Sequence, residues 1–398
     1  MAPQKIIIDT DPGVDDVLAI LMALASPEID VSLISIVFGN THAPVAHSNL
    51  LKIYHILAQE ITASSDAATR YTRLRGETKT VLAMGEDGPV GGDKAVAAYF
   101  HGLDGLSNIS ETHPRFTPPV RDPNAEHEHL EISPKPAYEA ILDVLRSEKS
   151  DTVTIVALGP LTNLAHALRT DPKTFSRVAN VVWMGGALDH PGNTSASAEF
   201  NCFADPYAAE QIISAVKQGA FDLIMCPLDI TTPHQIPFSD LIHDADTSTP
   251  IDPLRDFISA MLVRVRGLQA SFGLPDAMEM HDPVAVWYAI AHAGRSTLDS
   301  APSWATRPRE FKIERRGEYT RGMCVVDRRG TDEQSGDRTQ DKRLQAKVVP
   351  ILPPKDENFD RMGNATDRPQ RLPLVVASTP GSATLRKMLL QRVFGASV

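Results

Sequence analysis

The chain has 398 residues, of which 42% are hydrophobic, and it carries a formal net charge of −11 at pH 7. This acidic balance argues against a protein that binds nucleic acid or an anionic membrane surface. No apolar stretch approaches the ~20 residues that a membrane span needs, and the first residues show no secretory leader. Three widely spaced cysteines, Cys202, Cys226 and Cys324, lack zinc-ligand spacing and suit a reducing compartment. We therefore expect a soluble, cytoplasmic protein.

The sequence opens with a short apolar run that is followed by several carboxylates. Ile6–Ile8 predicts a buried parallel strand, which Pro12 and Gly13 end in a tight turn. Four carboxylates stand at or just after its end: Asp9, Asp11, Asp15 and Asp16. In a poorly solvated crevice they would repel one another strongly, so we expect a hard cation there, Ca²⁺ or Mg²⁺. The simpler alternative is that Asp15 or Asp16 only caps the helix that the spacing from Val17 to Leu24 predicts.

Regular elements recur along the rest of the chain. Further strands are expected at 31–37, 153–158, 181–184, 223–226 and 374–377, and antiparallel strands within 304–326. Helices are expected around 50–57, 135–146, 253–270 and 284–291, with a closing helix from 379 through 393. Alternation of strands and helices predicts an α/β fold, Rossmann-like, with a mostly parallel central sheet flanked by helices. We expect one domain over 1–398.

Two segments lack this regularity. Residues 60–135 are punctuated by Gly and Pro, and His101–Leu106 within them is typical of a mobile lid over a site. A solvent-exposed loop histidine is the simpler interpretation of His101. Residues 328–371 are polar, charged and rich in proline, which is typical of a peripheral and partly disordered insertion.

Polar side chains follow other predicted strands. Asn40 lies in the turn after the second strand, where it could be only a turn residue. Glu199 and Asn201 are two residues apart, so in an extended segment they would point the same way and could bind adjacent hydroxyls. Composition alone favours an ordinary surface loop there. Asp282, before Pro283, could be a helix N-cap, and His281 could be a buried core residue.

In combination these motifs resemble the nucleoside hydrolase family, the inosine–uridine type of N-ribohydrolases. The shared motifs are Asp9–Asp16, Gly39-Asn40, Leu158–Asn163, Met184–Gly186, Asn193 with Glu199–Asn201, and His281–Pro283. They occur in the family's order and span about residues 5–330. The resemblance implies the nucleoside hydrolase fold, hydrolysis of ribonucleosides to ribose and free base, a tightly bound Ca²⁺, and a homodimer or homotetramer. It also implies a role in nucleoside catabolism and purine or pyrimidine salvage.

The resemblance also implies roles for individual residues. Ca²⁺ would be held by Asp11, Asp16, Asp282 and the backbone carbonyl of Leu158. The ribose 2′- and 3′-hydroxyls would be held by Asp15, Asn201 and Asp282, and the 5′-hydroxyl by Asn193 and Glu199. The ribose pocket would also be lined by Asn40 and Met184.

The implied chemistry agrees with what these residue types can do. Cleavage of an N-glycosidic bond passes through an oxocarbenium-like ribosyl cation, which nearby carboxylates stabilise. Bound Ca²⁺ would lower the pKa of the attacking water, with Asp11 as general base. His281 or His101 would protonate the leaving base. The base would be contacted by residues within 76–110 and Gln269–Met280, and a histidine at 281 favours uridine and inosine as substrates.

Two alternatives remain at this stage. In a haloacid-dehalogenase-like phosphohydrolase, Asp9 would be the covalent nucleophile and Asp11 its acid and base, but Asp15, Asp16 and Asp282 would then have no role. A catalytically inactive nucleoside- or ribose-binding protein would be expected to lack one of the carboxylates, and none is missing. Binding without turnover would support this second alternative.

Overall fold

The computed structural model describes residues 2–76, 78–119, 126–243, 252–296, 299–328 and 371–396. Within them, a nine-stranded sheet has the order β10-β13-β7-β6-β5-β1-β2-β3-β4. Its strands are β1 Gln4–Thr10, β2 Ile29–Ile36, β3 Thr80–Met84, β4 Leu130–Ile132, β5 Val153–Ala157, β6 Asn180–Met184, β7 Leu223–Cys226, β10 Ala305–Pro308 and β13 Leu374–Ser378. Neighbouring strands are parallel except β10, which is antiparallel to β13. The predicted fold class, a mostly parallel sheet flanked by helices, is confirmed.

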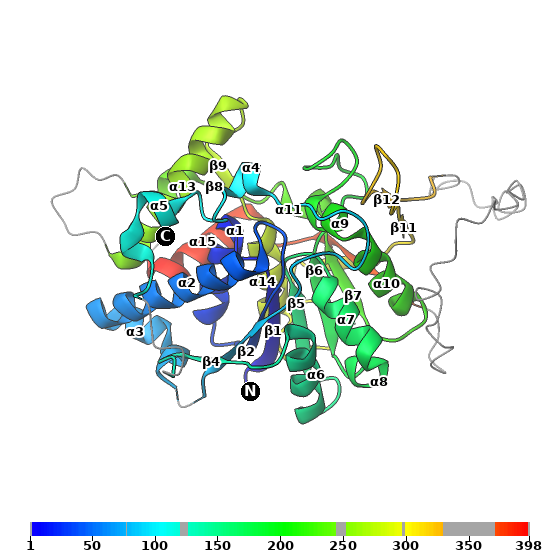
Figure 1. Ribbon diagram of the computed structural model, residues 1–398, viewed down its shortest axis with the longest axis horizontal. Helices are drawn as coiled ribbons and strands as arrows, with labels where there is room; N and C mark the ends of the chain where they lie inside the picture. The colour runs from blue at the N-terminus through cyan, green and yellow to red at the C-terminus, as the bar shows by residue number, and fades with distance from the viewer. Residues whose placement is uncertain are drawn as a thin grey trace, which may run out of the picture.

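Helices cover both faces of this sheet (Figure 1). One layer contains α1 Val14–Leu24, α2 Ala43–Ala63, α13 Pro253–Ser271, α14 His281–Ala291 and α15 Ser382–Phe394. The other contains α6 Ala137–Ser147, α7 Thr162–Thr170, α8 Pro172–Phe175 and α10 Pro206–Lys217. Ile6 and Ile8 of β1 pack into the first layer and Ile7 into the second, and all three are fully buried. This is why a central parallel strand is apolar at every position rather than at alternate ones.

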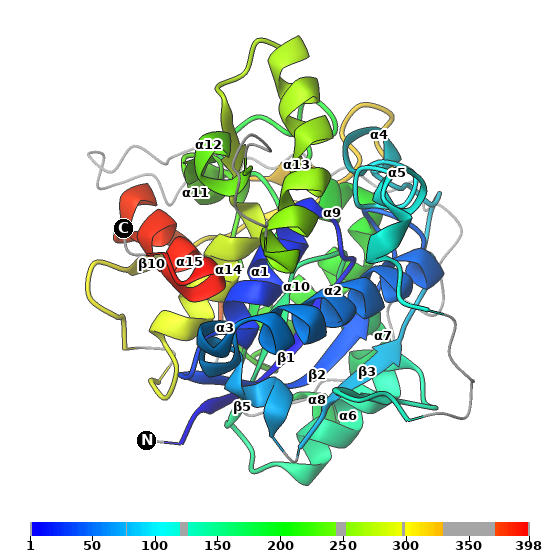
Figure 2. The same ribbon diagram turned by 90° about the vertical axis from the view of Figure 1, so that its left-hand side faces the viewer.

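Shorter elements complete the chain. They are α3 Ser65–Arg70, α4 Ala98–His101, α5 Ile109–Thr112, α9 Phe200–Ala204, α11 Leu228–Thr231, α12 Phe238–Leu241, and the 3₁₀ turns η1 Thr72–Arg75 and η2 Pro114–Phe116. Two antiparallel pairs lie outside the large sheet: β8 Gln235–Pro237 with β9 Ala277–Glu279, and β11 Lys312–Ile313 with β12 Cys324–Val325. Figure 2 shows α13 projecting beyond α1 and α2, on the side where α4 lies.

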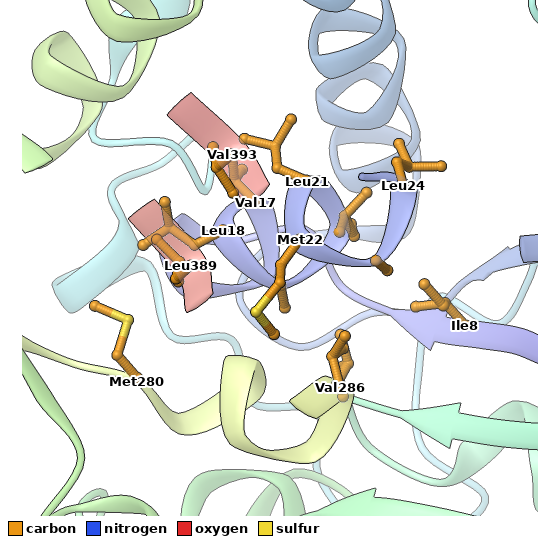
Figure 3. Close-up of a cluster of buried hydrophobic side chains, with 14 of the residues drawn as sticks. Ile8, Val17, Leu18, Leu21, Met22, Leu24, Met280, Val286, Leu389 and Val393 are labelled. Carbon is orange, nitrogen blue, oxygen red and sulfur yellow. The ribbon is translucent and has the colours of Figure 1, made fainter. Parts of the chain in front are cut away.

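Helix α1 is buried along its whole length. Figure 3 shows Val17 and Leu18 against Leu389 and Val393 of α15, and Met22 facing Val286 of α14. Burying a side chain of this size stabilises the fold by about 1.5–3 kcal/mol. Since α1 is enclosed on all sides, the turn before it and the carboxylates of its first turn are held in fixed positions.

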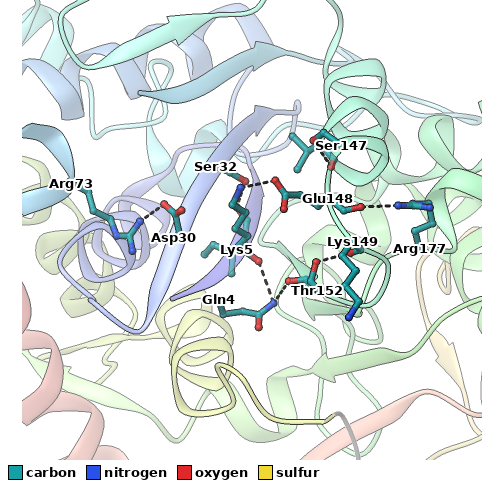
Figure 4. Close-up of polar contacts among 12 residues, drawn as sticks. Gln4, Lys5, Asp30, Ser32, Arg73, Ser147, Glu148, Lys149, Thr152 and Arg177 are labelled. Carbon is teal, nitrogen blue, oxygen red and sulfur yellow. Dashed lines mark hydrogen bonds and ion pairs between the residues drawn. The ribbon is translucent and has the colours of Figure 1, made fainter. Parts of the chain in front are cut away.

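The amino ends of the strands carry ordinary polar contacts instead of buried acids (Figure 4). Lys5 Nζ lies 2.5 Å from a carboxylate oxygen of Glu148, and Arg177 donates to the backbone carbonyl of Glu148 at 2.7 Å. Lys5 is partly exposed, so its ion pair stabilises the fold by no more than about 1 kcal/mol. This edge contributes to stability, whereas the buried acids lie at the carboxyl ends of the strands.

Most predicted elements are confirmed, with instructive exceptions. The predictions at 31–37, 153–158, 181–184, 223–226 and 374–377 correspond to β2, β5, β6, β7 and β13. The region 60–135, where strand signals are weak, nevertheless supplies β3 and β4, and the sequence analysis missed α10. The antiparallel strands expected within 304–326 are present as β10, β11 and β12.

Other predictions about the whole chain have mixed outcomes. The segment predicted as an insertion, 328–371, lies outside the described residues apart from its two ends. The single domain stays a prediction, which the continuity of the sheet from β1 to β13 supports. All three cysteines are free and buried. No described helix combines the length and apolar character that crossing a membrane requires.

Candidate active site

A cavity of about 710 Å³ opens at the carboxyl ends of the central strands. Ten residues singled out from the sequence line it: Asp15, Asn40, His101, Leu158, Met184, Asn193, Glu199, Asn201, His281 and Asp282. They come from the ends of β5 and β6, the loop after β2, and helices α1, α4, α9 and α14, with Asn193 and Glu199 from the loop before α9. The other two, Asp11 and Asp16, are buried beside this cavity. Segments distant in sequence therefore meet where the parallel fold predicts a site.

Three carboxylates converge at the cavity. One oxygen each from Asp15, Asp16 and Asp282 lies within 4.8 Å of the others. Asp15 and Asp16 are in the first turn of α1 and Asp282 in the first turn of α14. The predicted capping role is confirmed in part for Asp16: Gly13 is the N-cap of α1, and Asp16, two residues into the helix, caps it by accepting the N–H of Gly13 at 2.9 Å. For Asp282 the predicted N-cap is wrong, because Met280 is the N-cap of α14.

Asp11 lies beside this cluster with one oxygen unused. Its Oδ2 accepts the backbone N–H of Asn40 at 2.7 Å, and the side chain of Asn40 donates to Asp16 at 2.8 Å. The other oxygen of Asp11, Oδ1, is buried and accepts no hydrogen bond from the described residues. Burial and the charge of Asp16 hold the pKa of Asp11 well above its ordinary value.

Burial and neighbouring charges act in the same way on Asp15 and Asp282, which line the cavity. Burial and the charge of Asp16 raise the pKa of Asp15 to about 6. Burial and the charge of Asp15 hold the pKa of Asp282 well above its ordinary value. A bound cation would offset the free-energy cost of keeping these buried carboxylates charged, because it stabilises the charged form of every carboxylate around it.

The chemistry of the donor set fits a hard cation. Within the described chain, the donors grouped here are oxygen atoms: four buried carboxylates and the carbonyl of Leu158, just after β5. The side-chain amide of Asn201 donates to that carbonyl oxygen at 2.6 Å and to the carbonyl oxygen of Met184 at 3.0 Å. Ca²⁺ and Mg²⁺ prefer such ligands, so these residues fit the hard cation that the sequence analysis expects.

The local structure around Glu199 differs from the prediction. Residues Phe200–Ala204 form helix α9, and Glu199 is its N-cap, so the expected extended segment is wrong. The Glu199 carboxylate is buried and accepts the backbone N–H groups of Gly186 at 2.6 Å, Asn201 at 2.6 Å and Cys202 at 3.0 Å. Burial raises the pKa of Glu199, although these hydrogen bonds oppose the rise. Asn193 is exposed at the rim, and its Oδ1 accepts the N–H of Phe200.

His101 is buried, so its interpretation as a solvent-exposed loop residue is wrong. Its Nδ1 accepts the backbone N–H of Val14 at 3.2 Å, which leaves the proton of the neutral ring on Nε2. Burial lowers the pKa of His101 to about 3, assisted by the positive charges of His281 and Arg264. The following loop is tied to the site, because Asn49 donates to the carbonyls of Pro12 and Asp104.

His281 also lines the cavity, so it is not a core residue. Its Nδ1 lies 2.9 Å from the hydroxyl of Thr231, and its Nε2 lies 3.1 Å from a carboxylate oxygen of Glu279. Burial opposes the charged ring, but the hydrogen bond to Glu279 and the charge of Asp15 outweigh it and raise the pKa of His281. The two histidines of the site therefore favour opposite protonation states.

The sequence analysis assigned no role to Asn163, whose side chain joins β1, β2 and the loop after β3 by hydrogen bonds. Its side chain donates to Asp9 at 2.8 Å and to Ile36 O at 2.9 Å, and it accepts the N–H of Glu86 at 3.0 Å. Asp9 is fully buried, also accepts a hydrogen bond from Ser35, and does not line the cavity. This placement speaks against the phosphohydrolase alternative, which needs Asp9 as an exposed nucleophile.

One wall of the cavity is mainly apolar. Tyr99, Phe272 and Met278 line it, and the rings of Tyr99 and Phe272 are 6.4 Å apart. Arg264 of α13 donates to the carbonyls of Tyr99 and Phe100, which joins α13 to α4. Gln269 is buried in this wall, and its Oε1 accepts no hydrogen bond from the described residues. The two segments predicted to surround a base therefore both reach the cavity.

Comparisons with known proteins agree with this geometry. A family model described as inosine-uridine preferring nucleoside hydrolase matches residues 6–352. An uncharacterized protein of Schizosaccharomyces pombe is 30% identical over 327 residues, 81% of this chain and 89% of that protein. A non-specific ribonucleoside hydrolase of Salmonella paratyphi C is 30% identical over 336 residues, 83% of this chain and 89% of that protein.

Solved structures share the fold. A plant nucleoside hydrolase aligns with a TM-score of 0.68 at 23% identity, over 99% of this chain and 100% of that one. A purine-preferring ribonucleoside hydrolase from Gardnerella vaginalis aligns with a TM-score of 0.68 at 22% identity, over 98% of both chains. The chain belongs to the family of inosine-uridine preferring nucleoside hydrolases, and it is a hydrolytic enzyme of that family.

Proposed function

We propose that the protein hydrolyses the N-glycosidic bond of ribonucleosides to ribose and free base, with a bound Ca²⁺. The observation that carries this proposal is a cavity that is lined both by buried carboxylates and by an apolar wall with aromatic rings. Its volume of about 710 Å³ lies in the range of small-molecule sites. A ribose would face the carboxylates, and a flat base would lie against the aromatic rings.

We assign the cation to Asp11, Asp16, Asp282 and the carbonyl of Leu158. Asp15, Asn201 and Asp282 would hold the 2′- and 3′-hydroxyls, with Asn40 and Met184 beside them. Asn193 and Glu199 would meet the 5′-hydroxyl. Three backbone N–H groups already bind the Glu199 carboxylate, so Glu199 would also fix the start of α9, which carries Asn201.

The carboxylates supply the electrostatics of the reaction. As the bond to the base lengthens, positive charge develops on the ribose, and buried negative groups stabilise it strongly because the local dielectric is low. Bound Ca²⁺ would supply a Lewis acid that makes water more acidic. Asp11 would take the proton of the attacking water at Oδ1, the oxygen that accepts no hydrogen bond from the described residues.

The two histidines would act differently on the leaving base. His281, whose pKa is raised, would carry a proton that it can transfer to the base. His101, whose pKa is lowered to about 3, would stay neutral and donate a hydrogen bond from Nε2 without giving up its proton. We therefore assign the general acid to His281 and a binding role to His101.

We propose uridine and inosine as preferred substrates. The family model's description and the histidine at 281 support this preference, and Gln269 and the ring of Phe272 would meet the base. The relative from Salmonella paratyphi C is called non-specific, which supports a broad range of bases. A homodimer or homotetramer, a cytoplasmic location and a role in nucleoside salvage stay predictions; sedimentation of the purified protein tests the first.

Release of ribose from uridine, inosine, cytidine and adenosine tests the proposal. We expect turnover that EDTA abolishes and added Ca²⁺ restores, and that Asp11→Ala lowers by at least about 10²-fold. The rates then rank the bases. If folded, Ca²⁺-loaded protein binds nucleosides but hydrolyses none of them, the inactive binding protein becomes the better description.

A further inference from the structure

The side-chain amide of Asn49, a fully buried residue of α2, has a hydrogen-bond partner for each of its polar groups. Its Nδ2 donates to the carbonyl of Pro12 at 3.1 Å and to the carbonyl of Asp104 at 2.7 Å. Its Oδ1 accepts the ammonium group of Lys52 at 3.1 Å. A lysine ammonium can only donate, so Oδ1 must face Lys52 and the two N–H groups must face the carbonyls. The orientation of this amide is therefore fixed by its neighbours.

The two carbonyls belong to separate segments that meet beside the cavity. Pro12 follows Asp11 in the turn between β1 and α1. Asp104 is in the loop after α4, three residues beyond His101. His101 itself contacts the start of α1, because its Nδ1 accepts the backbone N–H of Val14 at 3.2 Å. A single amide thus joins the loop that follows His101 to the turn that precedes the carboxylates of α1.

The loop after His101 is folded around the carboxylate of Asp104. This carboxylate accepts the backbone N–H groups of Leu106 at 2.9 Å, Asn108 at 2.7 Å and Ser110 at 2.8 Å. Burial opposes the charged form of Asp104, but these hydrogen bonds outweigh it and lower the pKa of Asp104. Burial also lowers the pKa of Lys52, and the negative charge of Asp104 opposes that change. The loop therefore has a defined shape, and its charge complements that of the buried lysine.

The loop can approach Asn49 closely because residue 105 has no side chain. Gly105 has a φ of +75°, and a Cβ atom built on it would stand 3.0 Å from Nδ2 of Asn49. A second anchor lies nearby, where the hydroxyl of Thr41 donates to the carbonyl of Leu103 at 3.2 Å. Asn49 differs from this anchor because it also binds the turn that carries Asp11. It therefore sets the separation between the loop and that turn.

We propose that Asn49 is a positioning residue that holds the imidazole of His101 in the wall of the cavity. His101 accepts the N–H of Val14 at Nδ1, so its Nε2–H remains for the leaving base. Without the two N–H groups of Asn49, the loop can move away from the turn and carry this donor out of reach of the base. This inference rests on the proposed function, in which His101 binds the base.

A double-mutant cycle in kcat/KM for inosine and uridine tests whether Asn49 acts through His101. We expect His101→Ala to lower kcat/KM by about tenfold, and Asn49→Asp to lower it by about three- to tenfold. The aspartate keeps the size of the side chain and an oxygen for Lys52, but it offers no N–H to the two carbonyls. In the His101→Ala background, Asn49→Asp should lower kcat/KM by less than about twofold.

Hydrogen–deuterium exchange, followed by mass spectrometry, tests the position of the loop without reference to activity. We expect the backbone N–H groups of 102–110 to exchange at least about fivefold faster in Asn49→Asp, while those of β1 remain as protected as in the native protein. Asn49→Ala, which removes the whole amide, should show the same change. The matched control is Gln59→Ala, an exposed amide on the same helix, which should leave exchange and kinetics as in the native protein. Thermal unfolding in Ca²⁺ confirms that each variant is folded.

Several results would contradict the inference. Native exchange of 102–110 in both Asn49 variants would show that the loop does not depend on this amide. The same fold loss of kcat/KM with and without the imidazole would assign Asn49 a general structural role, for example through displacement of Asp11. Native kinetics in His101→Ala would remove the residue through which Asn49 is said to act. A native protein that hydrolyses no nucleoside would overturn the proposed function instead, and the exchange experiment would still show whether Asn49 holds the loop.

Discussion

Gly159 lies directly against the carboxylate of Asp11: a Cβ atom built on Gly159 would stand 2.6 Å from Oδ1. This is the buried oxygen that accepts no hydrogen bond from the described residues, and the absence of a side chain at 159 leaves space beside it. Gly39 touches the other oxygen in the same way. Asp11 is therefore enclosed by two residues that have no side chain.

Gly159→Ala should displace Asp11 while the fold is retained. We expect turnover of nucleosides to fall by about 10²-fold, because an error of about 1 Å at a reacting group has that effect. Calorimetric titration should also show weaker Ca²⁺ binding. The control is Gly88→Ala, where a Cβ meets nothing within 4 Å, and it should match the native protein. Native turnover in Gly159→Ala would contradict the placement of Asp11.

Asn163→Leu should destabilise the protein, because it removes one hydrogen-bond partner from each of three buried or partly buried groups. These are the carboxylate of Asp9, the carbonyl of Ile36 and the N–H of Glu86. Unsatisfied buried groups cost about 1–3 kcal/mol each with partial relaxation, so we expect the free energy of unfolding to fall by about 2–4 kcal/mol. Urea unfolding in Ca²⁺ measures it, with Thr170→Ala at the exposed end of α7 as control. A loss below about 1 kcal/mol would contradict this account.

His101 should make the folded state less stable in acid. Its pKa is about 3 when folded and near 6.5 when unfolded, so between these values only the unfolded chain binds the proton. The stabilisation that His101 contributes is complete above about pH 6.5 and is lost as the pH falls, by at most about 1.4 kcal/mol per unit. The buried aspartates with raised pKa act in the opposite direction, so the comparison must be between proteins that share them.

Chemical unfolding of the native protein and of His101→Gln at pH 7, 6 and 5 measures this contribution. We expect the stability difference between the two proteins to shrink as the pH falls. Thr170→Ala, at an exposed position without a titrating side chain, serves as the control and should give a constant difference. A constant difference for His101→Gln would show that its imidazole also takes up a proton in the folded state.

Removal of the cation should lower the melting temperature at neutral pH. Asp11, Asp15 and Asp282 have raised pKa values because buried charges crowd together, and a cation relieves that repulsion. A ligand that binds only the folded state at 100 times its Kd adds about 2.7 kcal/mol of stability. Thermal unfolding in EDTA and in Ca²⁺ or Mg²⁺ should show this increase and rank the two ions. Equal melting temperatures would contradict the assignment of these residues to a cation.

The parts of the fold that the sequence predicts well are those whose burial leaves a pattern. Ile6–Ile8 is apolar at every position because both faces of β1 are covered, and this reads plainly as a central parallel strand. In contrast, β4 has three residues of which only Leu130 is buried, so no pattern exists to be recognised. Helix α10 was missed although Asp205 and Pro206 mark its start, with Asp205 accepting the N–H of Ala208.

The candidate site divides in a similar way. Asp11, Asp15 and Asp16 lie within one short motif, so the sequence alone predicts that they act together in one site. The partners of His281 cannot be predicted in this way, because Thr231 is 50 residues away and contacts the ring only when α11 and α14 have packed together. His101 is likewise buried and accepts a hydrogen bond from Val14, which is 87 residues distant in the sequence. Sequence patterns indicate which residues carry chemistry, whereas tertiary contacts decide the protonation state in which they do so.

The antiparallel strand β10 has a consequence for how copies of this protein can associate. It forms one margin of the sheet and ends in Pro308, which has no N–H to offer to a further strand. The opposite margin, β4, is three residues long and carries the charged Glu131. Both margins within the described chain are therefore poor templates for strand addition. Assembly into a dimer or tetramer would have to join helical or loop surfaces, and the same two strands should protect the folded protein from aggregation through β-pairing.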